Sequence, residues 1–121
     1  MTSEKGDKEM NVISKMTIKR YSDYLTSELT LREAAERLSG NALPVVGECG
    51  QYLGIANEHI LLWALKTGAD WDTLLAEIAD DFPRPYATAA MDTEEVTDIV
   101  TEYGFVPVTD DRHVYIGSML R

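Results

Sequence analysis

A repeat within the chain constrains the fold more than any other sequence feature. Residues 43–54 and 106–117 each contain a short apolar run with a proline, a four-residue polar turn, and an apolar–aromatic run that ends in glycine. The matching residues are 63 positions apart without a gap, as Pro44 is from Pro107. Two short apolar runs joined by a polar turn are typical of a β-hairpin, so each copy predicts one hairpin.

An amphipathic helix is predicted before each hairpin. In the first copy, Thr30 and Glu33 form a capping box, in which the hydroxyl accepts from the helix and the carboxylate reaches back to the cap. In the second copy, Asp92 and Glu95 take these places. Apolar residues then recur at helical spacing, and a glycine ends each run. Each copy therefore predicts the order strand, helix, strand, strand, which is an α+β fold.

Two further helices are predicted between the hairpins. Asn57 can cap the first of them, over 58–67, and the second spans 71–79. A Phe-Pro-Arg-Pro stretch then breaks the helical pattern, because proline cannot continue a helix. Residues 86–89 are typical of a short strand that leads into the second copy, and residues 23–26 hold the same place in the first.

The predicted organisation of the chain has three parts. They are a polar N-terminal tail at 1–14, a first repeat with its linker helices at 15–79, and a second repeat at 80–121. The second repeat stops where its closing helix should begin, so the chain is expected to be a segment of a longer protein or a degenerate stand-alone copy. The tail has mixed charge and no apolar signal-peptide core, which predicts a cytoplasmic location.

Composition argues against several classes of function. A net charge of −10 opposes binding to phosphate backbones, so no direct nucleic-acid partner is expected. No apolar stretch is long enough to span a membrane. With the single cysteine Cys49, and two histidines without a third ligand at metal spacing, no metal site is predicted. Paired aspartates occur at 80–81 and 110–111, where turns and helix ends explain them. No catalytic motif is present, so the chain is not expected to be an enzyme.

The strings at 30–65 and 94–117 resemble CBS domains, which are named after cystathionine β-synthase. The first string carries the Pro-Val-Val strand and the Gly-Ile-Ala-Asn junction at the places where the family has them, and the resemblance covers roughly residues 15–121. It implies two β-α-β-β(-α) repeats related by a pseudo-twofold axis, with two clefts between them. Such pairs commonly bind AMP, ATP, S-adenosylmethionine or cyclic dinucleotides, require no further cofactor, and form homodimers.

The resemblance also implies where a ligand would bind, at strand ends and at the last strand–helix junction. His59 could contact a phosphate at the helix start, or could face solvent. Arg84 could face an anion, or be a solvated linker charge. Tyr86 and Tyr24 could stack on a base, or form core or dimer contacts. The candidate ligand-binding residues are Thr26, Ala42, Leu43, Pro44, Asn57, His59, Arg84, Tyr86, Thr88, Phe105, Val106 and Pro107.

Both junctions depart from the family pattern of Gly-x-x-Thr/Ser-x-x-Asp. In the first repeat, Asn57 replaces the hydroxyl residue and Ile60 replaces the aspartate that holds the ribose. In the second repeat, Leu120 stands at the hydroxyl position. Asn57 could still cap the helix and donate to an oxygen, whereas Ile60 cannot accept a hydrogen bond. At most one cleft is therefore expected to be competent.

Two functions remain open on the sequence alone. The first is a regulatory module that binds an adenine-containing nucleotide and controls an attached effector domain or a partner protein by population shift. The second is a ligand-free dimerisation module with degenerate nucleotide sites. Trp63 and Trp71 offer apolar surface that either closes the core or forms a homodimer face.

Overall fold

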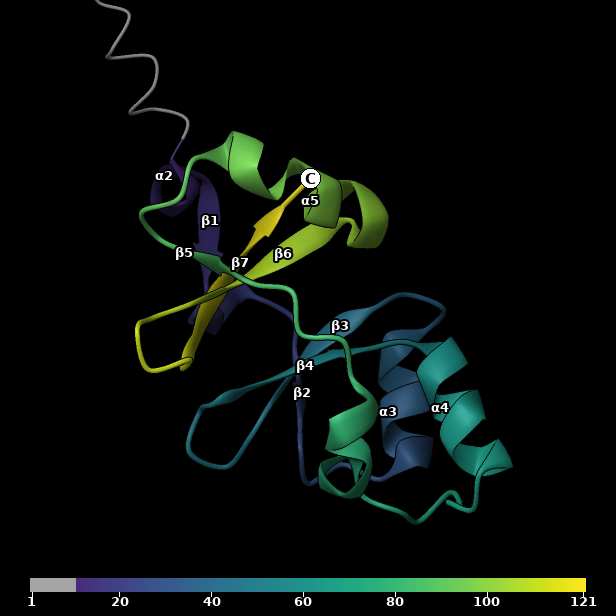
Figure 1. The fold of residues 1–121 in the computed structure, drawn as a ribbon. Helices are drawn as coiled ribbons and strands as arrows, with labels where there is room; N and C mark the ends of the chain where they lie inside the picture. Colours follow the sequence, from purple (N-terminus) through teal and green to yellow (C-terminus); the bar gives the residue numbers. More distant parts are fainter. Residues whose placement is uncertain (1–10) are drawn as a thin grey trace, which may run out of the picture. The chain divides into compact units, whose positions relative to one another are not determined.

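The computed structural model describes residues 11–121 and divides them into two compact units (Figure 1). The first unit is Asp23–Arg84. The second unit combines Pro85–Arg121 with residues 11–22, which come before the first unit in the chain. Each unit has its own cluster of buried apolar side chains. Within the described residues, none of the helices has the length and apolar character needed to cross a membrane.

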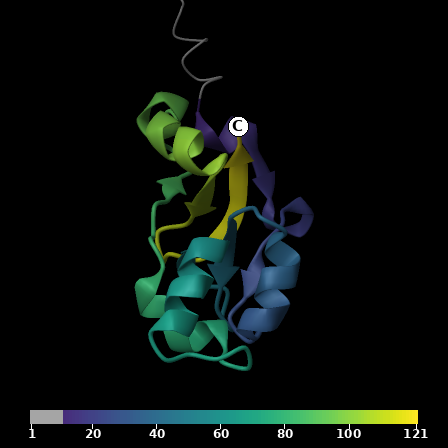
Figure 2. The same ribbon diagram turned by 90° about the vertical axis from the view of Figure 1, so that its right-hand side faces the viewer.

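The first unit consists of a three-stranded sheet, two α-helices and a 3-10 helix. The sheet has the strand order β2-β3-β4, with β2 parallel to β3 and β3 antiparallel to β4. Helices α3 and α4 lie next to each other on the same face of this sheet, as Figure 1 and Figure 2 show. The elements are β2 (Leu25–Thr26), α3 (Leu31–Leu38), β3 (Leu43–Val46), β4 (Tyr52–Ala56), α4 (Glu58–Lys66) and η2 (Leu75–Asp81).

The capping box predicted at the start of α3 is confirmed. The Glu33 amide donates to Thr30 Oγ1 at 3.2 Å, and the Thr30 amide donates to Glu33 Oε1 at 3.0 Å. The helix ends at Ser39, whose φ of 47° is in the left-handed region, and Gly40 continues this turn. The apolar face of α3 is buried in the core of the first unit, as the helical spacing of its apolar residues predicts.

The second unit is built on a four-stranded sheet with the order β1-β7-β6-β5. Strand β5 is parallel to β6, β6 is antiparallel to β7, and β1 is antiparallel to β7. The elements are α2 (Val12–Lys15), β1 (Met16–Ile18), η1 (Lys19–Tyr21), β5 (Ala87–Thr88), η3 (Thr93–Val96), α5 (Thr97–Tyr103), β6 (Phe105–Thr109) and β7 (Tyr115–Leu120).

The repeat predicted from the sequence is present in the register of the two sheets. Leu43 pairs with Ala56 in the first hairpin, and Val106 pairs with Met119 in the second, 63 residues further on. Both hairpins also contain a register shift at the same place, between the last two residues of their first strand. The prediction of two equivalent β-α-β-β repeats is therefore confirmed at the level of individual residue pairs.

The structure divides the chain differently from the predicted boundaries at 14 and 79. Residues 15–22 were expected in the first repeat, but β1 pairs with β7 of the second unit. Val12, expected in a polar tail, is fully buried in the second core, and its amide donates to the carbonyl of Met91. In the first unit Leu75 holds the same place, because it is also buried and its amide donates to the carbonyl of Leu29.

The helix predicted over 71–79 is wrong in its type and bounds. The structure has a 3-10 helix at Leu75–Asp81 in its place. Before it, Leu74 is extended with ψ near 150°, because this stretch lies along the residues that lead into α3. The amide of Leu31 donates to the carbonyl of Thr73 at 2.9 Å. This hydrogen bond, together with that from the amide of Arg32 to the carbonyl of Trp71, holds the backbone extended where the apolar spacing alone suggests a helix.

The turn of the second hairpin is organised by Asp110. Its carboxylate accepts from the amides of Arg112 at 2.8 Å and Val114 at 2.9 Å, and His113 between them has a φ of 64°. These two hydrogen bonds, first that from Val114, hold the pKa of Asp110 below its ordinary value.

Replacing Asp110 by alanine is expected to lower the melting temperature of the second unit at neutral pH. Because the pKa is lowered in the folded state, the carboxylate stabilises the fold above pH 3.8, and the stabilisation is lost as the pH falls through the folded-state pKa. Thermal melts from pH 7 to pH 2 should therefore show the gap between the wild type and D110A closing with acid. The exposed neighbour provides the control: an equal effect of D111A would contradict this role.

Candidate functional site

The start of β3 and the end of β4 meet at one end of the first sheet. Because the strands are antiparallel, Leu43 lies opposite Ala56 and Pro44 lies opposite Ile55. Asn57 follows β4 directly and begins α4. The structure thus brings Asn57 close to the candidates Ala42, Leu43 and Pro44, although Asn57 follows the hairpin in the chain and the other three are at its start.

Asn57 is the N-cap of α4, as predicted. Its Oδ1 accepts from the amide of Ile60 at 2.9 Å, so the side-chain oxygen is used by the helix and the NH₂ group is the part that could donate to a ligand. His59 lies in the first turn of α4 and is exposed. Ile60 is half-buried and packs against the core, so no side-chain acceptor stands at the ribose-binding position of this junction.

Thr26 lies at the other end of this sheet. It pairs with Val46, the last residue of β3, because β2 and β3 run parallel. At roughly 3.3 Å per residue, Thr26 is about 10 Å from the strand end where Leu43 begins. Tyr24, which precedes β2, is at the same end of the sheet as Leu43. The parallel pairing is a feature that the local sequence does not reveal.

The second unit repeats this geometry. Phe105, Val106 and Pro107 are buried at the start of β6, beside the end of β7, whereas Thr88 lies at the other end, where it pairs with Thr109. At the junction, Leu120 is 62% exposed. The nearby buried hydroxyl of Ser118 is 2.6 Å from that of Tyr115, so it takes part in an internal hydrogen bond.

Tyr86 lies just before β5 and is partly exposed. Its ring packs edge-on against the ring of His113 in the hairpin turn, with the ring centroids 5.0 Å apart. This contact holds both rings within the second unit. Nothing in the local sequence around His113 indicates this ring contact.

Comparison with known proteins identifies this architecture. The family model for the CBS domain matches residues 13–67. Among solved structures, CBSX2 from Arabidopsis thaliana in complex with AMP is 19% identical, with a TM-score of 0.71, over 92% of this chain and 90% of that one. A CBS domain protein from Streptococcus pneumoniae TIGR4 is 16% identical, with a TM-score of 0.74, over 99% and 91%. The chain folds as a CBS-domain pair.

A further solved structure that is similar to this chain is CbpB in complex with c-di-AMP. It is 14% identical, with a TM-score of 0.76, and the match covers 98% of this chain and 85% of that one. No curated protein sequence matches this CBS pair. The family resemblance seen in the two strings is therefore confirmed, and these structural likenesses establish the fold.

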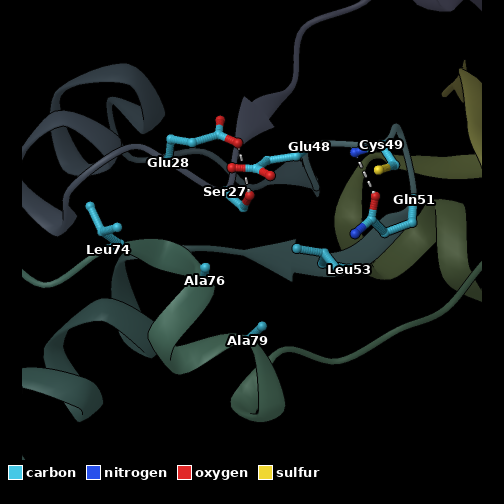
Figure 3. A pocket seen from close by; sticks show the side chains of 9 residues that line it. All are labelled: Ser27, Glu28, Glu48, Cys49, Gln51, Leu53, Leu74, Ala76 and Ala79. Carbon is cyan, nitrogen blue, oxygen red and sulfur yellow. Dashed lines mark hydrogen bonds between the residues drawn. The ribbon is translucent and has the colours of Figure 1, made fainter.

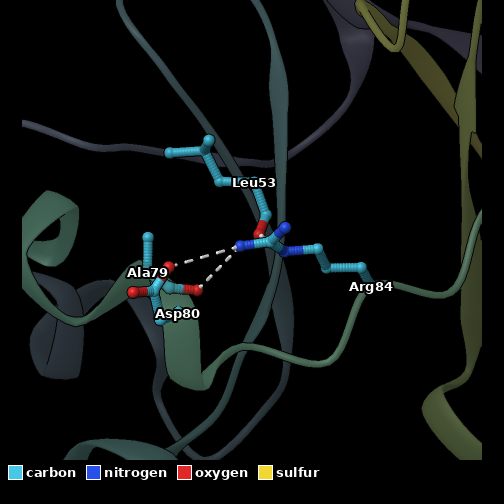
Figure 4. Close-up of polar contacts among 4 residues, drawn as sticks. All are labelled: Leu53, Ala79, Asp80 and Arg84. Atoms are coloured by element: carbon cyan, nitrogen blue, oxygen red, sulfur yellow. Dashed lines mark hydrogen bonds and ion pairs between the residues drawn. The ribbon is translucent and has the colours of Figure 1, made fainter.

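Arg84, at the end of the first CBS unit, is held by its own unit. Its Nε donates to the carbonyl of Leu53 at 3.1 Å, and one terminal nitrogen donates to the carbonyl of Ala79 and lies 3.9 Å from Asp80 (Figure 4). The guanidinium thus connects the segment after η2 to β4. Of the two alternatives for Arg84, an anion contact or a solvated linker charge, the first would require some of these contacts to be shared.

The first CBS unit also has a pocket of about 380 Å³ that the sequence did not predict. It lies at the end of the sheet near Thr26, and its wall carries Glu28, Glu48 and the exposed thiol of Cys49 (Figure 3). The pocket depends on a hairpin turn lying beside residues 74–79, which no local motif indicates. Among residues 11–121 of the CBS pair, no three His, Cys, Asp or Glu side chains are grouped to hold a metal ion.

Proposed function

We propose that this CBS pair is a regulatory module that binds an adenine-containing nucleotide of the AMP, ATP, S-adenosylmethionine or cyclic dinucleotide class. The observation that supports this most is the strand-end site of the first unit, where Leu43 and Pro44 lie beside the start of α4. Structural relatives that were solved with AMP and c-di-AMP share the fold. The proposal assigns the chain no catalytic step.

The start of α4 supplies the chemistry for an anionic group. The first amides of a helix have no partner within it, and the positive end of the helix dipole favours a phosphate. The NH₂ group of Asn57 and the exposed ring of His59 add donors there, whereas Glu58 in the same turn opposes a large negative charge. A nucleotide would therefore be held through its phosphate and its base, since Ile60 offers no carboxylate to the ribose hydroxyls.

The regulatory step follows from differential binding. A nucleotide that binds one arrangement of the two units more tightly shifts the population toward that arrangement. An attached effector domain or a partner protein that senses the arrangement would then change its activity. The size of the shift is limited by the ratio of the two affinities.

Replacing Asn57 by aspartate should abolish nucleotide binding while leaving the fold intact. Aspartate caps a helix about as well as asparagine, but it removes the NH₂ donor and adds a negative charge beside the phosphate. For the wild type, a ligand at 100 times its Kd should stabilise the fold by about 2.7 kcal/mol. Thermal melts with millimolar AMP, ADP, ATP, S-adenosylmethionine, NADH and c-di-AMP measure this shift.

The outcome is decided by comparing the two proteins. The proposal is supported if one of these ligands raises the Tm of the wild type, the shift is lost in N57D, and the melting temperature without ligand is unchanged. It fails if no ligand shifts the wild type, or if N57D responds as the wild type does.

The alternative function, a ligand-free dimerisation module, is favoured by the exposed apolar side chains of the first unit. Leu62 and Trp63 on α4 and Trp71 after it leave large apolar areas uncovered. A homodimer that covers them would explain their exposure and is compatible with sensing. Light scattering that shows a dimer, together with no response to any nucleotide, would favour this second function.

A further inference from the structure

Arg37 lies at the end of α3 that leads into β3. It is in the last turn of the helix, after which the chain turns through Ser39 and Gly40. One terminal nitrogen of its guanidinium donates to the carbonyl of Tyr24 at 3.1 Å. The side chain therefore reaches from α3 to the residue that leads into β2.

This contact places the guanidinium at the same end of the first sheet as the strand-end site. The parallel pairing of β2 with β3 puts Tyr24 beside Pro44. Asn57 is on the other side of β3, because it directly follows β4. Neighbouring strands are about 4.8 Å apart, so the two sides are separated by about 10 Å. A ligand that covers the start of β3 thus has α4 on one side and Arg37 on the other.

The other long basic side chains of the first unit lie away from this site. Arg32 is in the first turn of α3 and Lys66 is in the last turn of α4. Helix α3 runs toward the site and α4 runs away from it, so both residues are at the far ends of their helices. Arg84 is held by carbonyl groups near the start of β4 and at the end of η2. Of the Lys and Arg side chains that the structure describes in the first unit, Arg37 is the one at the strand-end site.

The guanidinium of Arg37 has donors left for a ligand. It carries five N–H groups, and the structure assigns it one hydrogen bond, that to Tyr24. Within residues 11–121 it forms no ion pair with a carboxylate. The side chain is exposed, so an anion can reach it while the contact with Tyr24 keeps it oriented.

The charges around this end of the sheet give such a cation a function. Asp23 and Glu36 are the chain neighbours of Tyr24 and Arg37, and Glu58 is in the first turn of α4. The net charge of the chain is −10. A ligand with several negative charges would be repelled here unless a fixed cation offset the carboxylates. Arginine suits this function, because it stays charged and can donate two parallel hydrogen bonds to a phosphate.

We propose that Arg37 binds a second phosphate group of the nucleotide, so that the strand-end site selects ligands with two or more phosphates, such as ATP or c-di-AMP. This inference rests on the function proposed above, in which the first phosphate lies at the start of α4. The separation of about 10 Å fits one phosphate on each side of β3, since each hydrogen bond spans about 3 Å of it. AMP would occupy the α4 side alone and would gain nothing from Arg37.

Calorimetric titration of AMP, ATP and c-di-AMP into the wild type and R37Q tests this assignment. At least one of ATP and c-di-AMP should bind the wild type more tightly than AMP does. R37Q should weaken the binding of that ligand by at least about tenfold, because a charged hydrogen-bonding partner is lost. The affinity for AMP should change by less than about twofold, since its phosphate lies beyond the reach of Arg37.

Two further variants separate the phosphate contact from a structural role. R32Q removes the same charge from the other end of the same helix, and should change each affinity by less than about twofold. R37K keeps the charge but loses the planar fork, so it should restore part of the affinity that R37Q loses.

The possible outcomes distinguish this inference from the proposed function. If the wild type binds none of the nucleotides, the proposed function fails and the inference fails with it. If the wild type binds AMP as tightly as ATP and c-di-AMP, nucleotide binding stands and the second-phosphate contact is overturned. The contact is also overturned if R37Q binds ATP and c-di-AMP as the wild type does, or if it weakens AMP equally.

Discussion

Replacing Gly54 by alanine is expected to unfold the first unit at temperatures where the wild type is folded. A Cβ at this position would lie 2.5 Å from the Cβ of Phe82 and 2.7 Å from the carbonyl oxygen of Pro83. The two segments cannot move apart cheaply, because the amide of Ile55 donates to that carbonyl at 2.8 Å. Backbone strain and overpacking each cost about 1–3 kcal/mol. A drop in Tm of more than about 10 °C should follow in thermal melts.

The matched control for this substitution is Gly68→Ala. Gly68 has a φ of 124°, close to the 133° of Gly54, but a Cβ there would meet nothing within 4 Å. G68A therefore measures the cost of placing a side chain at a positive φ, and the additional loss in G54A measures the close contact. Equal losses of stability in the two variants would show that the close contact with Phe82 and Pro83 adds nothing to the cost of G54A.

The second unit has a similar close contact, which explains why both copies of the internal repeat have glycine at this position. A Cβ at Gly117 would clash with the carbonyl oxygen of Thr17 in β1. Gly54 and Gly117 are the residues that end the two hairpin patterns in the sequence. Each lets a segment from outside its hairpin lie directly on the strand, so packing between the segments requires glycine at both positions.

Local sequence signals predicted the parts of the fold that depend on short-range chemistry. The capping pair Thr30 and Glu33, the helix cap Asn57 and both hairpins are present as expected, because their hydrogen bonds join residues close together in the chain. The 63-residue spacing of the repeat also appears in the register of the two sheets.

The features that the sequence could not predict depend on long-range pairing. Thr26 and Thr88 were grouped with the strand-end candidates. The parallel pairing of β2 with β3, and of β5 with β6, instead places each threonine at the opposite end of its sheet. Residues 11–14 were expected in the N-terminal tail and residues 15–22 in the first repeat, but both segments belong to the second unit. Their short apolar pattern fits an edge strand in either sheet, so the choice of partner is decided by the whole fold.

Replacing Leu61 by alanine is expected to destabilise the first unit by about 3 kcal/mol, the typical cost of removing a buried leucine side chain. Leu61 is 2% exposed and packs into the core shared by α3, α4 and the sheet. The deletion leaves a cavity, since the strands on the other side are held by backbone hydrogen bonds. The free energy of unfolding from urea titrations measures the loss.

The next residue in the helix supplies a control of identical chemistry. Leu62 is 60% exposed, so L62A should change the free energy of unfolding by no more than about 0.5 kcal/mol. If the exposed apolar side chains of α4 form a homodimer face, L62A should instead weaken dimerisation, which L61A would affect only through unfolding. Equal losses of stability in the two variants would contradict the burial of Leu61, and not Leu62, against the core.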